Sequence, residues 1–105
     1  MISKNIFELL PSIRNYFQDK PISRAWLFGS CSRGEETPES DIDILVDYDT
    51  SGGIVSLFKM GGMLMDLSEL LGRRVDLIDI RGVKEFARPG IDNDKILIYE
   101  RALTR

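Results

Sequence analysis

The sequence predicts an α+β fold, a small mixed β-sheet flanked by helices, from two kinds of pattern. Apolar residues recur at helical spacing over about residues 3–19 and 54–71, whereas short runs over about 24–28, 41–48 and 73–79 have the composition of strands. The last two strands are joined by the long helix, and such a right-handed crossover makes them parallel neighbours in one sheet. We therefore expect one sheet with one modest core.

The first helix is predicted to begin after Ser3, whose side chain is a good N-cap, and to run to about Asp19. Its apolar stripe is expected in the core, and comprises Ile6, Leu9, Leu10, Ile13, Tyr16 and Phe17. Pro11 interrupts this pattern, and either kinks the helix or starts a second one at its first turn. Pro21 ends the helical segment.

A phosphate-binding turn is predicted where the apolar run 26–28 stops at Gly29-Ser30. If Ser30 to Arg33 open a short helix, the backbone N–H groups and the positive end of the helix dipole face one point. An anionic phosphate is stabilised there. Gly29 lets the ligand approach closely, and the Ser30 hydroxyl adds a donor.

Two carboxylates follow this turn. Side chains two apart on a strand share a face, so Asp41 and Asp43 project together, roughly 6–7 Å apart. The apolar residues Ile42, Ile44 and Val46 face the other side. Neighbouring carboxylates repel each other, and a divalent cation removes that penalty. A few oxygen ligands, with positions left for water and substrate phosphates, suit Mg²⁺. Either half of the pattern taken alone would favour an ordinary turn and exposed acids.

Other charged side chains are expected in solvent. They comprise the loop acids Glu35, Glu36 and Glu39, the arginines Arg73 and Arg74, and Asp47 and Asp49 at the far end of the second strand. Asp47 and Asp49 continue the alternation that presents Asp41. We favour solvent for them because the metal should lie near the Gly29-Ser30 turn.

The long helix is predicted over about Ile54 to Leu71 and ends at Gly72, which suits a C-cap. Its apolar face is expected to comprise Ile54, Leu57, Phe58, Met65, Leu67, Leu70 and Leu71. Gly61-Gly62 costs about 1 kcal/mol per residue relative to Ala, so close packing or local bending is expected there.

In the third strand, Asp76 is predicted to stand beside the two earlier carboxylates, whereas Asp79 points to the opposite face. The rest of the chain predicts a helical turn near 83–86, a break at Pro89-Gly90 and a short edge strand at 96–99.

Composition restricts the class of function and the compartment. One domain over residues 1–105 is expected, with 43% hydrophobic and 30% charged residues. The net charge of −3 argues against general nucleic-acid binding, and so against a templated polymerase. No apolar run has the length of a membrane span, and we expect no signal peptide, because the first residues lack its basic and apolar regions. The single Cys31 has no His to activate it, so we interpret it as a structural residue in a reducing cytoplasm.

The motif as a whole resembles a known family. Gly29-Ser30, ten intervening residues and Asp41-x-Asp43 resemble the signature of the polymerase-β-like nucleotidyltransferase superfamily. The string Phe-Gly-Ser-x-x-Arg-Gly, followed by Ser-Asp-Ile-Asp-Ile-Leu-Val, is similar to its minimal nucleotidyltransferase (MNT) branch. The match is dense over 25–48, and Cys31-Ser32 departs from it at non-catalytic positions. The resemblance implies the palm-like nucleotidyltransferase fold, with the site at the end of the sheet where the motif halves meet.

The resemblance also implies metal-dependent transfer of a nucleoside monophosphate to an acceptor hydroxyl, with release of pyrophosphate. Asp76 matches the superfamily's third carboxylate. Asp41, Asp43 and Asp76 would then bind Mg²⁺ or Mn²⁺, and Asp76 would also orient or deprotonate the acceptor.

The outer phosphates of ATP or another NTP would lie on Gly29, Ser30 and the nearby N–H groups. Two interpretations of Arg33 remain open. It either helps to hold the phosphates or pairs with a nearby acid, Glu35, Glu36 or Asp41.

For a stand-alone member of the branch, the resemblance implies a partner, a small all-helical HEPN protein. In such pairs the nucleotidyltransferase is the antitoxin, and some members transfer AMP from ATP to a tyrosine of the HEPN toxin. The alternative function is a binding module, an antitoxin or complex subunit that neutralises its partner by contact while its site stays idle.

Overall fold

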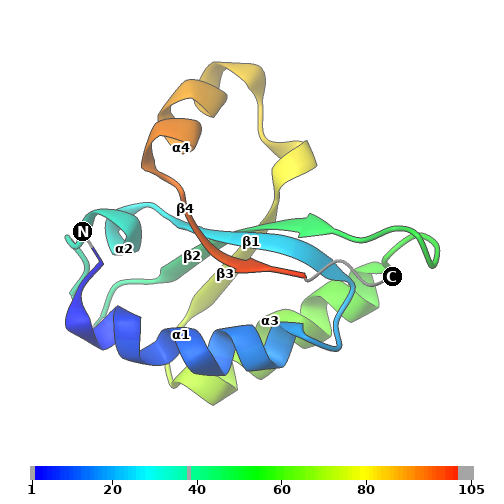
Figure 1. Ribbon diagram of the computed structural model, residues 1–105, viewed down its shortest axis with the longest axis horizontal. Helices are drawn as coiled ribbons and strands as arrows, with labels where there is room; N and C mark the ends of the chain where they lie inside the picture. Colours follow the sequence, from blue (N-terminus) through cyan, green and yellow to red (C-terminus); the bar gives the residue numbers. More distant parts are fainter. Residues whose placement is uncertain (1, 38, 102–105) are drawn as a thin grey trace.

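The computed structural model describes residues 2–37 and 39–101, which form a four-stranded sheet with helices on both sides (Figure 1). Along the chain the elements are α1 (Lys4–Phe17), β1 (Ile22–Phe28), α2 (Ser30–Arg33), β2 (Ile42–Tyr48), α3 (Leu57–Leu71), β3 (Val75–Asp79), the 3₁₀ helices η1 (Ile80–Gly82) and η2 (Glu85–Ala87), α4 (Arg88–Asp94) and β4 (Ile96–Glu100). The predicted α+β class is confirmed.

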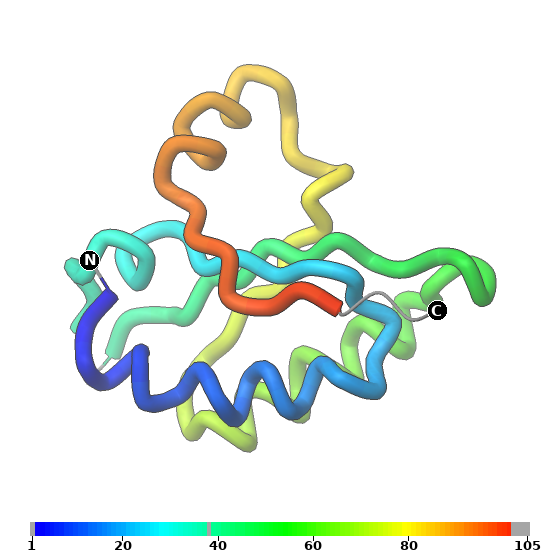
Figure 2. Tube along the Cα trace, viewed as in Figure 1, coloured from blue at the N-terminus to red at the C-terminus, as the bar shows by residue number. Residues whose placement is uncertain are grey.

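The sheet is mixed, with the strand order β3, β2, β1, β4. β2 pairs parallel with β3, as the crossover through α3 predicts, and antiparallel with β1, while β4 pairs antiparallel with β1 at the far edge. The edge strand predicted near 96–99 is therefore confirmed. α1 and α3 lie together on one side of the sheet (Figure 1). The segment from η1 to α4, yellow to orange in Figure 2, rises on the other side.

α1 packs on the sheet as one continuous helix. The Ser3 side chain caps it by accepting from the Ile6 N–H at 3.3 Å. The buried residues recur at helical spacing, and are Ile6, Leu10, Ile13 and Phe17. Pro11 lies inside the helix on its exposed side, so the helix does not restart there. Phe7, whose carbonyl loses its N–H partner at Pro11, is itself an exposed residue.

The face of α3 that packs on the sheet differs from the predicted one. The helix buries Met63, Leu67 and Leu71, which lie four residues apart on one row. Five of the seven predicted core residues are exposed instead: Ile54, Leu57, Phe58, Met65 and Leu70. The helix is capped by Ser56 and begins at Leu57, so Ile54 lies outside it. The prediction merged two rows of apolar residues on different faces.

Gly61 and Gly62 lie on the exposed side of α3. A Cβ at either position would have nothing within 4 Å among the described atoms. The close packing expected at these glycines is therefore absent within the described part of the chain. Gly72 ends the helix at φ 66°, as predicted.

The segment before β4 corrects a second prediction. Pro89-Gly90 does not interrupt the secondary structure, because α4 begins at Arg88 and has Pro89 in its first turn. The first turn of a helix needs no N–H from that position, so proline is tolerated there. The predicted helical turn near 83–86 corresponds to η2, which starts at Glu85. No helix in the described ranges is long and apolar enough to cross a membrane.

Candidate active site

Gly29 shapes the turn after β1. Its φ of 70° and ψ of −152° form a conformation that L side chains rarely adopt, and α2 follows at Ser30 as predicted. A Cβ built on Gly29 would lie 2.8 Å from Oδ2 of Asp43. Only a bare backbone fits at that distance. The two halves of the motif therefore meet at this turn.

A residue that the sequence did not single out closes the turn. Ser32 is buried, its Oγ donates to the Gly29 carbonyl at 2.8 Å, and its N–H donates to the same oxygen at 3.1 Å. Ser30, by contrast, is half-buried at the start of α2. A serine two residues after the predicted turn carries no sequence signal, because its role depends on the backbone path.

The three predicted carboxylates lie at the same end of the sheet. Asp43 in β2 is the register partner of Asp76 in β3 and of Phe28 in β1, while Asp41 lies one residue before β2. Burial raises the pKa of Asp43, and the negative charges of Asp76 and Asp41 raise it further. Asp41 is half-buried and Asp76 is exposed. The trio is thus close enough to repel, at the end where β1 runs into Gly29.

The three carboxylates have the chemistry of ligands for a divalent cation, but their arrangement does not form a complete binding site. Carboxylate oxygens are the ligands that Mg²⁺ prefers, and a cation would relieve the repulsion that raises the pKa of Asp43. Within residues 2–37 and 39–101, no three acidic, thiol or imidazole side chains are grouped closely enough to hold a metal ion together. The site is an open row of oxygen donors.

Cys31 supports the site from behind. Its side chain is fully buried, and its Sγ donates to the Asp41 carbonyl at 3.5 Å. Burial raises the pKa of the thiol, so it stays protonated at neutral pH. This placement favours the structural interpretation of Cys31.

Arg33 lies beside the turn and is engaged by acids. Its Nε donates to Glu35 at 2.8 Å and its Nη1 to Asp94 of α4 at 2.9 Å. Of the two interpretations left open, pairing with Glu35 is the one that this structure contains. The contact with Asp94 was not anticipated, and it ties α2 to α4 across 61 residues of sequence.

Two residues expected in solvent are buried instead. The Glu36 side chain is 4% exposed and the Arg73 side chain 15% exposed, and they pair at 3.4 Å. Arg73 also donates to two carbonyls of the loop between the motif halves. No local pattern reveals a pair that is 37 residues apart. Arg74 is 78% exposed, as predicted.

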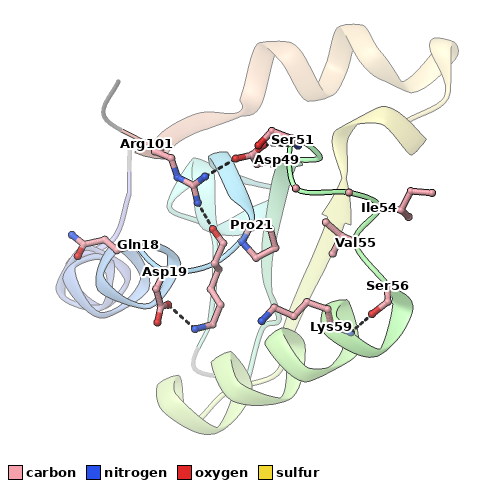
Figure 3. A pocket seen from close by; sticks show the side chains of 13 residues that line it. Gln18, Asp19, Pro21, Asp49, Ser51, Ile54, Val55, Ser56, Lys59 and Arg101 are labelled. Carbon is pink, nitrogen blue, oxygen red and sulfur yellow. Dashed lines mark hydrogen bonds and ion pairs between the residues drawn. The ribbon is translucent and has the colours of Figure 1, made fainter. Parts of the chain in front are cut away.

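Asp47 and Asp49 are not free in solvent either, since each is ion-paired. Asp47 lies 3.1 Å from Arg81, and Asp49 lies 2.6 Å from Arg101. Asp49 also lines a cavity of about 610 Å³ with Pro21, Lys59 and other residues (Figure 3). This cavity adjoins the Ile22 and Tyr48 end of the β1–β2 pair, whereas Asp43 lies at the other end. It is therefore separate from the carboxylates.

Comparison with known proteins identifies a family profile that matches this chain and proteins with similar sequences. The family profile described as "Polymerase beta, Nucleotidyltransferase" matches residues 11–103. A protein of Methanocaldococcus jannaschii, provisionally named a protein adenylyltransferase, is 34% identical over 95 residues, which are 89% of this chain and 94% of that protein.

Solved structures agree on the fold. A structure provisionally named a minimal nucleotidyltransferase matches with a TM-score of 0.75 and 27% identity, over 91% of this chain and 95% of that one. A chain from a complex of a tri-AMPylated Shewanella oneidensis HEPN toxin with an MNT antitoxin matches with a TM-score of 0.60 and 20% identity, over 91% and 70% of the two chains.

Proposed function

The chain belongs to the polymerase beta nucleotidyltransferase family, and we propose that within this family it is a metal-dependent protein adenylyltransferase. The oxygen of an acceptor hydroxyl attacks the α-phosphorus of ATP, a new P–O bond forms, and the bond to pyrophosphate breaks. The predicted enzyme class is confirmed by the match over residues 11–103 and by the name of the Methanocaldococcus relative.

The observation that carries the proposal is the meeting of Gly29, Asp43 and Asp76. Gly29 lies against Asp43, and Asp43 is in register with Asp76. Asp41, Asp43 and Asp76 would hold Mg²⁺ or Mn²⁺, which neutralises charge on the phosphates when bound. Asp76 is the most accessible of the three, so it is placed to orient or deprotonate the acceptor hydroxyl.

The nucleotide would lie on the turn. The Gly29 backbone, the Ser30 hydroxyl and the N–H groups of α2 offer donors for the outer phosphates of ATP or another NTP. Arg33 would join them only by leaving Glu35 and Asp94, its partners in this structure.

We propose a tyrosine of a HEPN toxin as the acceptor, with this chain as the antitoxin. The provisional name of the Methanocaldococcus relative supports a protein as the acceptor of AMP, and the complex of a tri-AMPylated HEPN toxin with an MNT antitoxin supports a HEPN toxin as that protein. The choice of a tyrosine rests on the family resemblance of the motif. The expectations of one domain over residues 1–105 and of a cytoplasmic location are part of the same proposal. The buried, protonated Cys31 suits a reducing compartment.

The test is label transfer from α-labelled ATP with Mg²⁺, with and without the protein encoded beside this chain, which we propose to be the HEPN partner. We expect label on the HEPN protein, and we expect the label to disappear with Asp41→Ala and with Asp43→Ala. Labelled UTP, GTP and CTP in parallel reactions measure the base preference.

The competing function is neutralisation by contact. A tight complex without any label transfer would support it and contradict the adenylyltransferase. Asp41→Ala separates the two in cells, because a contact antitoxin still protects them from the toxin, whereas an enzyme without Asp41 does not.

A further inference from the structure

The backbone of Asp41 lies outside the strand ladder, so other contacts must fix it. β2 begins only at Ile42, whose N–H donates to the Arg74 carbonyl at 2.9 Å. The Asp41 carbonyl accepts from Cys31 at 3.5 Å. The carbonyl of the preceding residue, Ser40, accepts from Arg73 Nη2 at 2.7 Å. Each side of Asp41 is thus held by the segment that leads into β3.

Arg73 contacts two further residues of the loop besides Ser40. The same Nη2 atom donates to the Thr37 carbonyl at 2.9 Å and lies 3.4 Å from Oε2 of Glu36. The Ser40 N–H donates to the Thr37 carbonyl at 3.0 Å, so Arg73 binds both ends of a closed turn. One guanidinium therefore connects the loop between the motif halves to the start of β3, three residues before Asp76.

Glu36 keeps Arg73 in place. Its side chain is 4% exposed, and its Oε1 accepts from the Ser3 hydroxyl at 2.5 Å. Ser3 is also the N-cap of α1, so the acid links the loop to the helix behind the sheet. A buried arginine whose carboxylate partner is removed keeps an uncompensated charge, which drives it toward water. Arg73 would then leave Ser40.

We propose that Arg73, held by Glu36, is a positioning residue for Asp41. The pair fixes the loop that joins the Gly29-Ser30 turn to Asp41, and so sets where Asp41 stands relative to Asp43 and Asp76. This inference rests on the proposed function, since it assigns Asp41 a part in the reaction. A merely structural pair would change stability and leave the turnover of folded molecules unchanged.

The test compares Arg73→Gln with Arg81→Gln. Arg81 is a control with the same bonding pattern, because it also combines an ion pair, to Asp47 at 3.1 Å, with a bond to a backbone carbonyl, that of Tyr48 at 3.1 Å. Its side chain is 55% exposed, against 15% for Arg73, so the melts report the expected difference in stability. It lies at the opposite end of β2 from Asp41. Both variants are assayed at a temperature where thermal melts show them fully folded.

We expect Arg73→Gln to lower kcat about 10- to 100-fold, as loss of a support behind a ligand does, with the KM for ATP changed less than about 3-fold because the Gly29-Ser30 turn is intact. Arg73→Lys keeps the charge and should recover part of the loss. Arg81→Gln should keep the wild-type kcat. Wild-type kcat in folded Arg73→Gln, or an equal loss in Arg81→Gln, would overturn the proposal.

A second measurement is independent of activity. Hydrogen exchange at the Ser40 and Ile42 amides should be faster in Arg73→Gln than in the wild type, and unchanged in Arg81→Gln. If the wild type transfers no label, the proposed function fails, and the exchange comparison still decides whether Arg73 orders the backbone around Asp41. If Arg73→Gln does not fold, Glu36→Gln takes its place in both measurements, because it keeps most of the side-chain volume and removes the charged partner of Arg73.

Discussion

Asp43 and Asp76 are register partners on the parallel strands β2 and β3, which places two carboxylates of like charge side by side. The pKa of Asp43 is raised by burial first and by Asp76 and Asp41 next. Repulsion of this kind destabilises the folded state unless a cation or a proton compensates it. The carboxylates that the proposed reaction needs therefore lower the stability of the folded state. Stability and label transfer can be measured separately in variants of Asp43.

Asp43→Asn should abolish transfer without destabilising the protein. The pKa of Asp43 is higher in the folded than in the unfolded state, so the folded state is more stable with Asp43 protonated than with Asp43 ionised. This stabilisation is fully present below the ordinary pKa of 3.8 and is lost as pH rises through the folded value. At pH 7 the variant should melt at the same or a higher temperature than the wild type, and this difference should vanish toward pH 3.8. Melts across pH without divalent cations, beside label transfer reduced by about 100-fold or more, test both parts. A variant that melts lower at pH 7 would contradict the repulsion.

Mg²⁺ should raise the melting temperature of the wild type and leave that of Asp43→Asn nearly unchanged. A ligand that binds only the folded state stabilises it by about 2.7 kcal/mol at 100 times its dissociation constant. NaCl at matched ionic strength is the control, because general screening also relieves like-charge repulsion. Equal shifts in the two proteins would show that Mg²⁺ acts elsewhere.

The local parts of this site were predictable. The turn at Gly29, the short helix after it and the shared end of Asp43 and Asp76 follow from strand alternation and from one crossover rule. These features depend on residues near in sequence or on topology with a fixed hand.

The remainder depends on contacts that only the folded chain creates. In the sequence, Glu36 and Arg73 each have the pattern of a solvated charge. They are 37 residues apart, and only folding brings them into contact. α3 carries apolar residues on two faces, so its buried row is decided by where the helix begins. That start is set by Ser56, whose side chain caps the helix, and not by a residue before Ile54 as the predicted bounds require.

Gly29→Ala should cost both stability and activity, and Gly72→Ala is the control for a side chain at positive φ. Gly72 has φ 66° and ψ 24°, in the left-handed region, where alanine costs about 1–2 kcal/mol. Gly29 has φ 70° and ψ −152°, a region essentially restricted to glycine, so its variant carries at least as much backbone strain. Only at Gly29 does the new Cβ meet Asp43, at 2.8 Å, whereas at Gly72 it has open space. Urea melts should show the larger loss in Gly29→Ala, and label transfer should fall in that variant alone. Equal losses of stability with activity retained would contradict the contact between turn and carboxylate.

Substitutions on the two faces of α3 should differ sharply in their effect on stability. Leu67 is fully buried, so Leu67→Ala should lower the free energy of unfolding by about 2–5 kcal/mol. Phe58 is 95% exposed, so Phe58→Ala should change it by no more than about 0.5 kcal/mol. Gly61→Ala should raise it by up to about 1 kcal/mol, because the added methyl has open space and favours the helix.

Urea unfolding at two protein concentrations measures these changes and identifies the source of any exception. A loss of stability in Phe58→Ala similar to that in Leu67→Ala would contradict the exposure of this face in solution. If that loss grew with protein concentration, a second copy of the chain would be covering Phe58, because only an association between chains makes stability depend on concentration. If it did not, the helix would be packed on the sheet by the face originally predicted.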